Sequence, residues 1–253
     1  MQWRKLFDLN PLYAVLSDKI AAREFVASRV GADLLSPLLW TGSTPEQIPF
    51  ATLDPPYILK CNHGSGYNII VSDRATLDIA ATREKLRSWL VTNYGRFAHE
   101  PGYMPVRPQL LAEQMMLEPD GTPPLEFKIF VFDGKPRMIH TIIVDRARER
   151  FDAFHDCDWR RLDWRGIHPP FDTELDRPRR LNDFLALAEQ LGAGFDHLRV
   201  DLYQWRGEPR VGELTLYNWS GLFPLKPDEA EIAAGEWWQL RSPVRRALAA
   251  MLS

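Results

Sequence analysis

The sequence lacks the features that mark several specialised classes of protein. Its 253 residues include only two cysteines, too few for a disulfide framework, so we expect a reducing cytoplasm. No apolar run approaches the roughly 18–20 residues of a membrane-spanning helix. The N-terminus, MQWRKLFDLNPLY, has no apolar core or cleavage site of a signal peptide. The net charge of -3 argues against nucleic acid as a non-specific partner.

What is present predicts an α+β protein of two lobes. With 45% hydrophobic and 26% charged residues, the chain can bury a sizeable core. Apolar periodicity and turn signals place helices at 11–30, 75–92 (with Asp73 as its cap), 179–192 and 242–253. Strands are expected at 57–61, 68–72 and 107–116, and hairpins at 125–146, turning at Asp133-Gly134, and at 197–219.

A Pro-, Gly-, Ser- and Thr-rich stretch at 41–56 indicates a linker, and we expect a hinge near 114–120. The predicted organisation is therefore an N-terminal helical segment with its linker (1–55), a first lobe (56–116) and a second lobe (117–253).

The stretch YILKCNHGSGYNIIVSD, residues 57–73, joins two apolar strands through a lysine and a glycine turn. Gly64 and Gly66 allow a ligand to approach the backbone closely, and freed N–H groups can form an anion-binding nest. The turn is neither a Walker A loop nor a Rossmann fingerprint, because no Gly-Lys-Ser/Thr follows and the next element is a strand. A plain β-turn, an exposed Lys60 and a structural His63 remain the alternatives.

The second hairpin carries a predicted pair of acids. Strand alternation puts Arg199 and Asp201 on one face, and a turn centred on Gly207 would pair Asp201 with Glu213. Two carboxylates that close would repel unless they share a cation, and Mg²⁺ commonly takes one or two carboxylates. The opposite, core face would hold Val200, Leu202, Leu214 and Leu216. A solvated face is the alternative, since a shift of one residue separates the acids.

The order of these pieces resembles that of ATP-grasp proteins, and most closely that of the teichuronopeptide-biosynthesis (TupA-like) ATP-grasp family of polysaccharide biosynthesis. The resemblance covers roughly residues 10–240. Its segments are ILKCNHGSGYNIIVSD, LLAEQMM, EFKIFVFDGKPR, VDR at 144–146, FHDCDW at 154–159, RVDLY and GELTLYNWSG.

The resemblance implies an ATP-grasp fold and a role for each matching position. The implied ATP-binding residues are Lys60, the turn residues His63, Gly64, Ser65 and Gly66, the adenine-slot residues Glu113, Gln114 and Met116, and Lys128. The implied Mg²⁺ ligands are Asp201, Glu213 and Thr215. The implied catalytic residues are Arg199, which would stabilise charge on the transferring phosphate, and Arg146, which would face the acceptor.

The resemblance also implies a function, with two departures from the family pattern. The implied reaction is ATP-dependent joining of an amine or amino acid to an acidic cell-surface polysaccharide or its sugar-acid precursor. A lipid-linked acceptor would bring the protein to the inner membrane surface. Thr215 stands where many ATP-grasp enzymes have Asn, so water or Asn218 would complete the metal shell. About 55 residues precede the first lobe, too few for a separate substrate domain.

Two other functions stay open at this point. Asp156-Cys157-Asp158 is a DxD triplet, which metal-dependent glycosyltransferases use to hold a nucleotide sugar. Thr215 in place of Asn would also suit a non-catalytic nucleotide- or glycan-binding module. Binding of a nucleotide sugar with Mn²⁺, or binding without turnover, would separate these functions from a ligase.

Overall fold

The computed structural model describes residues 1–8, 10–144 and 149–239. The chain divides into two compact units. Unit 1 comprises the described parts of residues 1–9, 125–209 and 214–253, and unit 2 comprises residues 10–124 and 210–213. The finer division into a segment at 1–55 and lobes at 56–116 and 117–253 stays a prediction.

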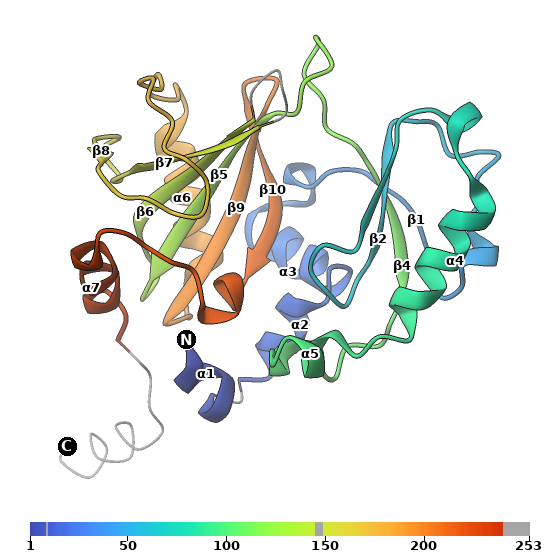
Figure 1. The fold of residues 1–253 in the computed structure, drawn as a ribbon, viewed down its shortest axis with the longest axis horizontal. Coiled ribbons are helices and arrows are strands. Elements are labelled where there is room, and N and C mark those ends of the chain that lie inside the picture. The colour runs from blue at the N-terminus through green and yellow to red at the C-terminus, as the bar shows by residue number, and fades with distance from the viewer. Residues whose placement is uncertain (9, 145–148, 240–253) are drawn as a thin grey trace. The chain divides into compact units, whose positions relative to one another are not determined.

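Unit 2 is built on a four-stranded antiparallel sheet with the strand order β1-β4-β2-β3. Its strands are β1 (Leu38–Gly42), β2 (Tyr57–Cys61), β3 (Asn68–Val71) and β4 (Leu110–Gln114). Its α-helices are α2 (Leu12–Ser17), α3 (Ala21–Val30), α4 (Ile79–Leu90) and α5 (Tyr94–Phe97). Helix α4 runs beside the sheet (Figure 1), and its Leu86 joins the core formed by Tyr57, Leu59 and Ala112.

Unit 1 is built on the six-stranded sheet β10-β9-β5-β6-β7-β8. Its strands are β5 (Leu125–Phe132), β6 (Lys135–Val144), β7 (Arg150–His155), β8 (Arg161–Leu162), β9 (His197–Trp205) and β10 (Glu208–Thr215), of which Arg210–Glu213 are counted with unit 2. Its α-helices are α1 (Gln2–Phe7), α6 (Leu181–Gly192) and α7 (Asp228–Glu236).

Helix α6 covers one face of the unit 1 sheet and so determines which side chains face away from it. Phe184 of α6 packs edge to face on Phe127 of β5, with ring centroids 5.2 Å apart. Side chains alternate along a strand, so the neighbours of Phe127 on β5, Glu126 and Lys128, lie on the opposite face. Directly paired residues share a face, and Lys128 pairs with Asp201 of β9 and with His140 of β6. The sheet therefore has one apolar face covered by α6. Its other face carries Lys128 and Asp201, and is called the charged face here, although it also bears a buried apolar cluster that includes Phe130, Phe132 and Leu225.

The two hairpins and the core face of the second one confirm the sequence prediction. Strands β5 and β6 turn at Asp133 and Gly134, both with positive φ (49° and 75°), as a type I′ hairpin turn requires. Val200, Leu202, Leu214 and Leu216 are all buried. Strand β2 also has the predicted bounds. The helix expected at 242–253 lies outside the described residues.

Two helix predictions were wrong at their boundaries. The segment 11–30 is two helices, because the Asp18 carboxylate accepts hydrogen bonds from the Ile20 and Ala21 N–H groups and so begins a new helix. Helix α4 begins after Asp78, whose carboxylate accepts from the Ala81 N–H. Asp73 instead caps a short 3₁₀ turn. In both cases an acidic cap inside a periodic stretch was overlooked.

The predicted linker 41–56 also contains structure. It takes in the end of β1 and a 3₁₀ turn at Pro45–Gln47 with a capping box between Thr44 and Gln47. In the part of the chain that the structure describes, no helix combines the length and the apolar character needed to cross a membrane.

Candidate functional site

The glycine turn leaves the end of β2 in unit 2 and is packed against aromatic side chains. Tyr67 stacks on Trp89 with ring centroids 5.0 Å apart, and Tyr94 meets Tyr67 edge to face at 5.7 Å. A Cβ on Gly64 would lie 2.8 Å from the Tyr67 ring, so only glycine fits there. Gly66 has a φ of +76° and open space around it, so its requirement is conformational.

The other two turn residues differ in exposure. Ser65 is exposed, and its side chain hydrogen-bonds Tyr94, whose pKa burial raises to about 12. His63 is buried; its Nε2 lies 3.2 Å from the Trp89 carbonyl and its Nδ1 has no partner. Burial lowers the pKa of His63, so the ring is neutral at pH 7. The exposed part of the turn that can meet a ligand is therefore Ser65-Gly66.

Lys60 and Glu113 form an ion pair across neighbouring strands of unit 2. The Lys60 ammonium donates to Glu113 Oε2 at 2.6 Å, and Arg23 of α3 donates to Glu113 Oε1 at 2.5 Å. Arg23 also donates to the Ser36 carbonyl at 2.6 Å, which fixes its position. Two cations around one carboxylate leave a net positive charge beside the glycine turn. The sequence did not predict the role of Arg23, because the periodicity of a helix shows which face a residue lies on but not which distant residue it binds.

Gln114 and Met116 follow Glu113 at the end of β4. The Gln114 side chain is exposed and that of Met116 is half-buried. The Gln114 N–H donates to the Pro37 carbonyl, and the Met115 N–H donates to that of Pro56. Their roles in an adenine slot stay predictions.

The charged face of the unit 1 sheet carries a compact ionic cluster. Arg199 donates to both oxygens of Asp201, from Nε and from Nη2, each at 2.7 Å. Lys128 donates to Asp201 Oδ2 at 3.0 Å and to Glu126 Oε1 at 2.7 Å. Asp201 is only 2% exposed, which rules out a solvated face for this carboxylate. The sequence predicted three of these residues; the i, i+2 spacing in EFK could have added Glu126.

The electrostatics of this cluster favour the charged forms of Asp201 and Lys128. Burial alone would raise the pKa of Asp201, but Arg199 and Lys128 together lower it to about 2. Burial would likewise lower the pKa of Lys128, yet Asp201 and Glu126 raise it. Asp201 and Lys128 therefore form a buried ion pair at neutral pH.

Thr215 and Asn218 hold the guanidinium of Arg199. The Thr215 hydroxyl oxygen accepts from Nη2 at 2.9 Å, and the Asn218 side-chain oxygen accepts from Nη1. Arg199 is thus fixed in direction by three residues, Asp201 included. The metal roles proposed for Thr215 and for Asn218 stay predictions. Arg146 lies outside the described residues.

Glu213 binds a residue that sequence reasoning missed. Lys19 donates to Glu213 Oε1 at 2.9 Å and to the Gly64 carbonyl at 2.8 Å. Asp201 and Glu213 are counted with different units, so their direct pairing stays a prediction.

The predicted metal ligands offer the type of atom that Mg²⁺ binds. All three predicted ligands, Asp201, Glu213 and Thr215, offer oxygen atoms, which Mg²⁺ prefers. Three hydrogen bonds to Asp201 occupy three of the about four acceptor positions that a carboxylate has. Among the described residues, no three His, Cys, Asp or Glu side chains cluster so that they could hold a metal.

A buried pair of His140 and Asp152 lies beside the ionic cluster, since His140 of β6 is the strand partner of Lys128. His140 Nε2 lies 2.8 Å from Asp152 Oδ1, and the ring stacks on Phe154 at 4.5 Å. Burial lowers the pKa of His140 despite the Asp152 carboxylate. The pair is enclosed and satisfied, so we assign it to the core.

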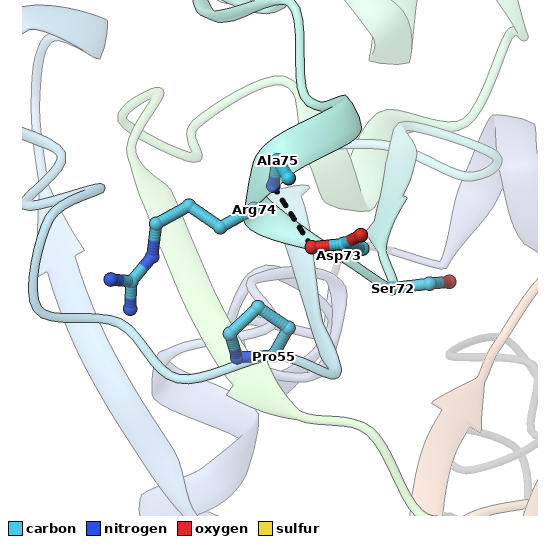
Figure 2. Close-up of a pocket in the computed structure, with 5 residues that line it drawn as sticks. All are labelled: Pro55, Ser72, Asp73, Arg74 and Ala75. Carbon is cyan, nitrogen blue, oxygen red and sulfur yellow. Dashed lines mark hydrogen bonds between the residues drawn. The ribbon is translucent and has the colours of Figure 1, made fainter.

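Two further features contain none of the predicted ligase residues. An open depression in unit 2 is lined by Pro55, Ser72, Asp73, Arg74 and Ala75. Figure 2 shows that the Asp73 carboxylate accepts a hydrogen bond from the Ala75 N–H and that the Arg74 side chain points away from it. Arg74 donates to the Leu53 carbonyl and to Asp54 Oδ1. In unit 1, the DxD triplet lies in the turn between β7 and β8.

The first aspartate of the triplet has a local structural role. Asp156 Oδ1 accepts hydrogen bonds from the Asp158 N–H at 2.9 Å and the Arg160 N–H at 2.8 Å. Its carboxylate therefore stabilises the turn.

Comparison with known proteins identifies a family. Residues 1–237, nearly the whole chain, match the profile of the family described as TupA-like ATPgrasp. The comparison with curated proteins gives no match. D-alanine–D-alanine ligase from Bacillus anthracis complexed with ATP superimposes with a TM-score of 0.50 at 18% identity, over 87% of this chain and 61% of that chain.

Two other solved structures are more distant. The ATP-grasp ligase PsnB, complexed with a phosphomimetic variant of its minimal precursor, Mg and ADP, has a TM-score of 0.46 at 14% identity, over 81% of this chain and 51% of that chain. N5-carboxyaminoimidazole synthase from Aspergillus clavatus has a TM-score of 0.45 at 12% identity, over 79% and 44%. The present chain spans about three fifths of the length of the Bacillus ligase. The family match and the similarity to that ligase confirm the expected α+β ATP-grasp fold.

Proposed function

Because the chain belongs to the TupA-like ATP-grasp family, we propose that it is an ATP- and Mg²⁺-dependent ligase that joins a carboxylate to an amine through an acylphosphate. The observation that carries the proposal is the buried cluster of Lys128, Asp201 and Arg199 on the charged face of the unit 1 sheet. Burying charges is costly, so a cluster at the positions of a family pattern favours a functional origin.

The proposed reaction has two steps, phosphorylation of the carboxylate and displacement of phosphate by the amine. A carboxylate oxygen of the substrate attacks the γ-phosphorus of ATP, an O–P bond forms, and the bond to the ADP oxygen breaks. An amine nitrogen then attacks the carbonyl carbon of the acylphosphate. The C–N bond forms, the C–O bond to phosphate breaks, and the amine gives up a proton. The products are an amide, ADP and phosphate.

In this proposal the residues of the chain bind and orient the phosphates. In unit 2, the proposed phosphate contacts are Lys60 and the Ser65-Gly66 backbone, beside which Arg23 offsets the negative charge of Glu113. In unit 1, the proposed phosphate contacts are Lys128 and Arg199, whose positions are fixed by their hydrogen bonds to Asp201. Charged groups that are already held in position stabilise a transition state most effectively. Asp201 and Glu213, with Thr215, would hold Mg²⁺, which when bound neutralises charge on the transferring phosphate.

For the substrates we propose the carboxylate of a sugar acid in an acidic polysaccharide or its precursor, and the amine of an amino acid. The description of the family as TupA-like is consistent with this assignment, which rests on the resemblance to polysaccharide-biosynthesis proteins. A lipid-linked form of the acceptor would place the reaction at a membrane surface.

The test is calorimetric titration with a non-hydrolysable ATP analogue, with and without Mg²⁺, followed by assays of phosphate release. We expect micromolar binding that requires Mg²⁺, and phosphate release that needs both a uronic acid and an amine. Binding of the analogue without release for any carboxylate and amine would favour a binding module. No binding at millimolar analogue would contradict the proposal.

A further inference from the structure

Lys19 joins two parts of the candidate site that are far apart in the sequence. It lies between α2 and α3, and its ammonium donates to the Gly64 carbonyl at 2.8 Å and to Glu213 Oε1 at 2.9 Å. One side chain therefore contacts both the glycine turn and the predicted metal ligand, within unit 2.

The backbone of Lys19 is anchored to the same turn. Its N–H donates to the Asn62 carbonyl at 3.0 Å, and the Asn62 side-chain amide donates to Asp18 Oδ1 at 2.9 Å. Asn62 is fully buried and exchanges two hydrogen bonds with the backbone of Gln109. The base of the lysine side chain is thus fixed relative to the turn, and only its flexible stem loses entropy when the ammonium binds Glu213.

An ordinary surface ion pair does not explain this arrangement. Such pairs contribute little, partly because both long side chains lose freedom. The Lys19 side chain is only 17% exposed, and its second acceptor is the carbonyl of Gly64, a residue at which a Cβ would lie 2.8 Å from the Tyr67 ring. Its contact with Glu213 involves Oε1 alone. Hydrogen bonds of this kind from outer residues orient metal-binding carboxylates, and their loss typically weakens metal affinity.

We propose that Lys19 is a positioning residue, which orients Glu213 for Mg²⁺ and holds the Gly64 carbonyl at the same time. The phosphate-binding turn and the metal ligand then reach their binding geometry together. The inference rests on the proposed function, because it takes Glu213 to be a metal ligand.

The experiment compares the Mg²⁺ concentration that gives half-maximal binding of the ATP analogue in full-length variants. Lys19→Met keeps the length of the side chain but removes its charge and its donors. We expect this concentration to rise about 10–100-fold, the usual effect of losing an outer-shell partner. Lys19→Arg should recover part of the loss. The matched control is Lys135→Met, an exposed lysine of β6, which should behave like the wild type.

Amide exchange supplies a second readout that needs no catalysis. In the wild type, Mg²⁺ with the analogue should protect the peptide covering residues 61–68. In Lys19→Met that protection should require more Mg²⁺. In a Glu213→Gln background, Lys19→Met should change the Mg²⁺ requirement no further, because the carboxylate that it orients is gone.

Each outcome decides the matter. A wild type that does not bind the analogue overturns the proposed function, and this inference with it. A wild type that binds normally, with an unchanged Mg²⁺ requirement in Lys19→Met, overturns the inference alone, even where thermal stability falls. A lower Mg²⁺ requirement in Lys19→Met would mean that the lysine competes with the metal, and would also overturn it. If Lys19→Met does not fold, Lys19→Gln takes its place under the same criteria.

Discussion

Each unit pairs cations with carboxylates among its own predicted phosphate- and metal-binding residues, but the two units do so at different depths. In unit 1, Arg199 and Asp201 are 8% and 2% exposed, and Arg199 contributes both hydrogen bonds of a bidentate pair. In unit 2, the Lys60 side chain is 21% exposed and that of Glu213 is 39% exposed. The buried cluster is enclosed by the sheet, whereas the shallower pairs are partly open to solvent.

The difference follows from where the residues lie on their strands. Lys128 and Asp201 are direct partners within β5 and β9, inside a six-stranded sheet, so neighbours surround them. Lys60 is the penultimate residue of β2, just before the strand ends at the glycine turn. The depth of each pair therefore follows from its place in its own sheet.

The largest expected effect comes from breaking the buried pair. Arg199→Met would leave Asp201 buried with Lys128 as its charged partner and would remove the donor to Thr215 and Asn218. Removing one partner of a buried ion pair typically costs about 3–5 kcal/mol. Denaturant unfolding should show this loss. Arg199→Met with Asp201→Asn should cost less than the sum of the single changes, because the buried carboxylate charge is then gone and Lys128 keeps Glu126 as its partner.

The control for that experiment comes from unit 2. Arg87 pairs with Glu46 and Glu84 on the surface. Arg87→Met should leave the unfolding free energy unchanged within error, since exposed pairs contribute little. Equal losses for Arg87→Met and Arg199→Met would show that depth does not distinguish the two kinds of pair.

The next largest effect should be the loss of stability at acid pH, which we expect to be greater in unit 1 than in unit 2. Burial lowers the pKa of His140, of His155 to about 4 and of His197 to about 3, all in unit 1. Only the unfolded chain takes up these protons as the pH falls below about 6.5, so unit 1 loses stability progressively from there down to the folded-state values. Unit 2 has one such shift among its described residues, at His63.

We expect amide exchange, corrected for intrinsic rates, to show greater loss of protection in unit 1 than in unit 2 between pH 7 and pH 5. His155 stacks on Trp159 with centroids 4.1 Å apart, and its Nδ1 has no partner. His155→Phe keeps the stacking and removes the titration, so it should flatten the pH dependence of unit 1. An unchanged slope in this variant would contradict the assignment.

Removing Lys60 from its pair with Glu113 should affect ligand binding more than stability. Lys60→Met removes a predicted phosphate contact but leaves Glu113 with Arg23 as a partner. A charge-assisted hydrogen bond contributes about 1.5–3 kcal/mol, so affinity for the ATP analogue should fall about 10–100-fold. Calorimetry measures this, and unfolding should shift by a smaller amount. Unchanged affinity would remove Lys60 from the site.

How far the sequence could predict this site depends on the range of the contacts. Alternation and turn signals identified both hairpins and the buried face of β9, because these are local properties of a strand. The break at Asp18 was missed because the apolar stripe continues across it. Arg23 and Lys19 were missed because their partners, Glu113 and Glu213, are 90 and 194 residues away, and periodicity gives a face but no partner.

The smallest expected effect concerns the DxD triplet, the feature that favoured a glycosyltransferase. The Asp158 side chain is 70% exposed and pairs with Arg160, which is 75% exposed. A surface substitution of this kind usually changes stability by no more than about 0.5 kcal/mol, so Asp158→Ala should leave both unfolding and ATP-analogue binding unchanged.

Titration of the wild type and the variant with a nucleotide sugar and Mn²⁺ is the sharper measurement. Because the Asp156 carboxylate is engaged by two backbone N–H groups of its own turn, we expect no binding in either protein. Binding by the wild type that is lost in Asp158→Ala would restore the glycosyltransferase hypothesis and place a metal site in the unit 1 turn.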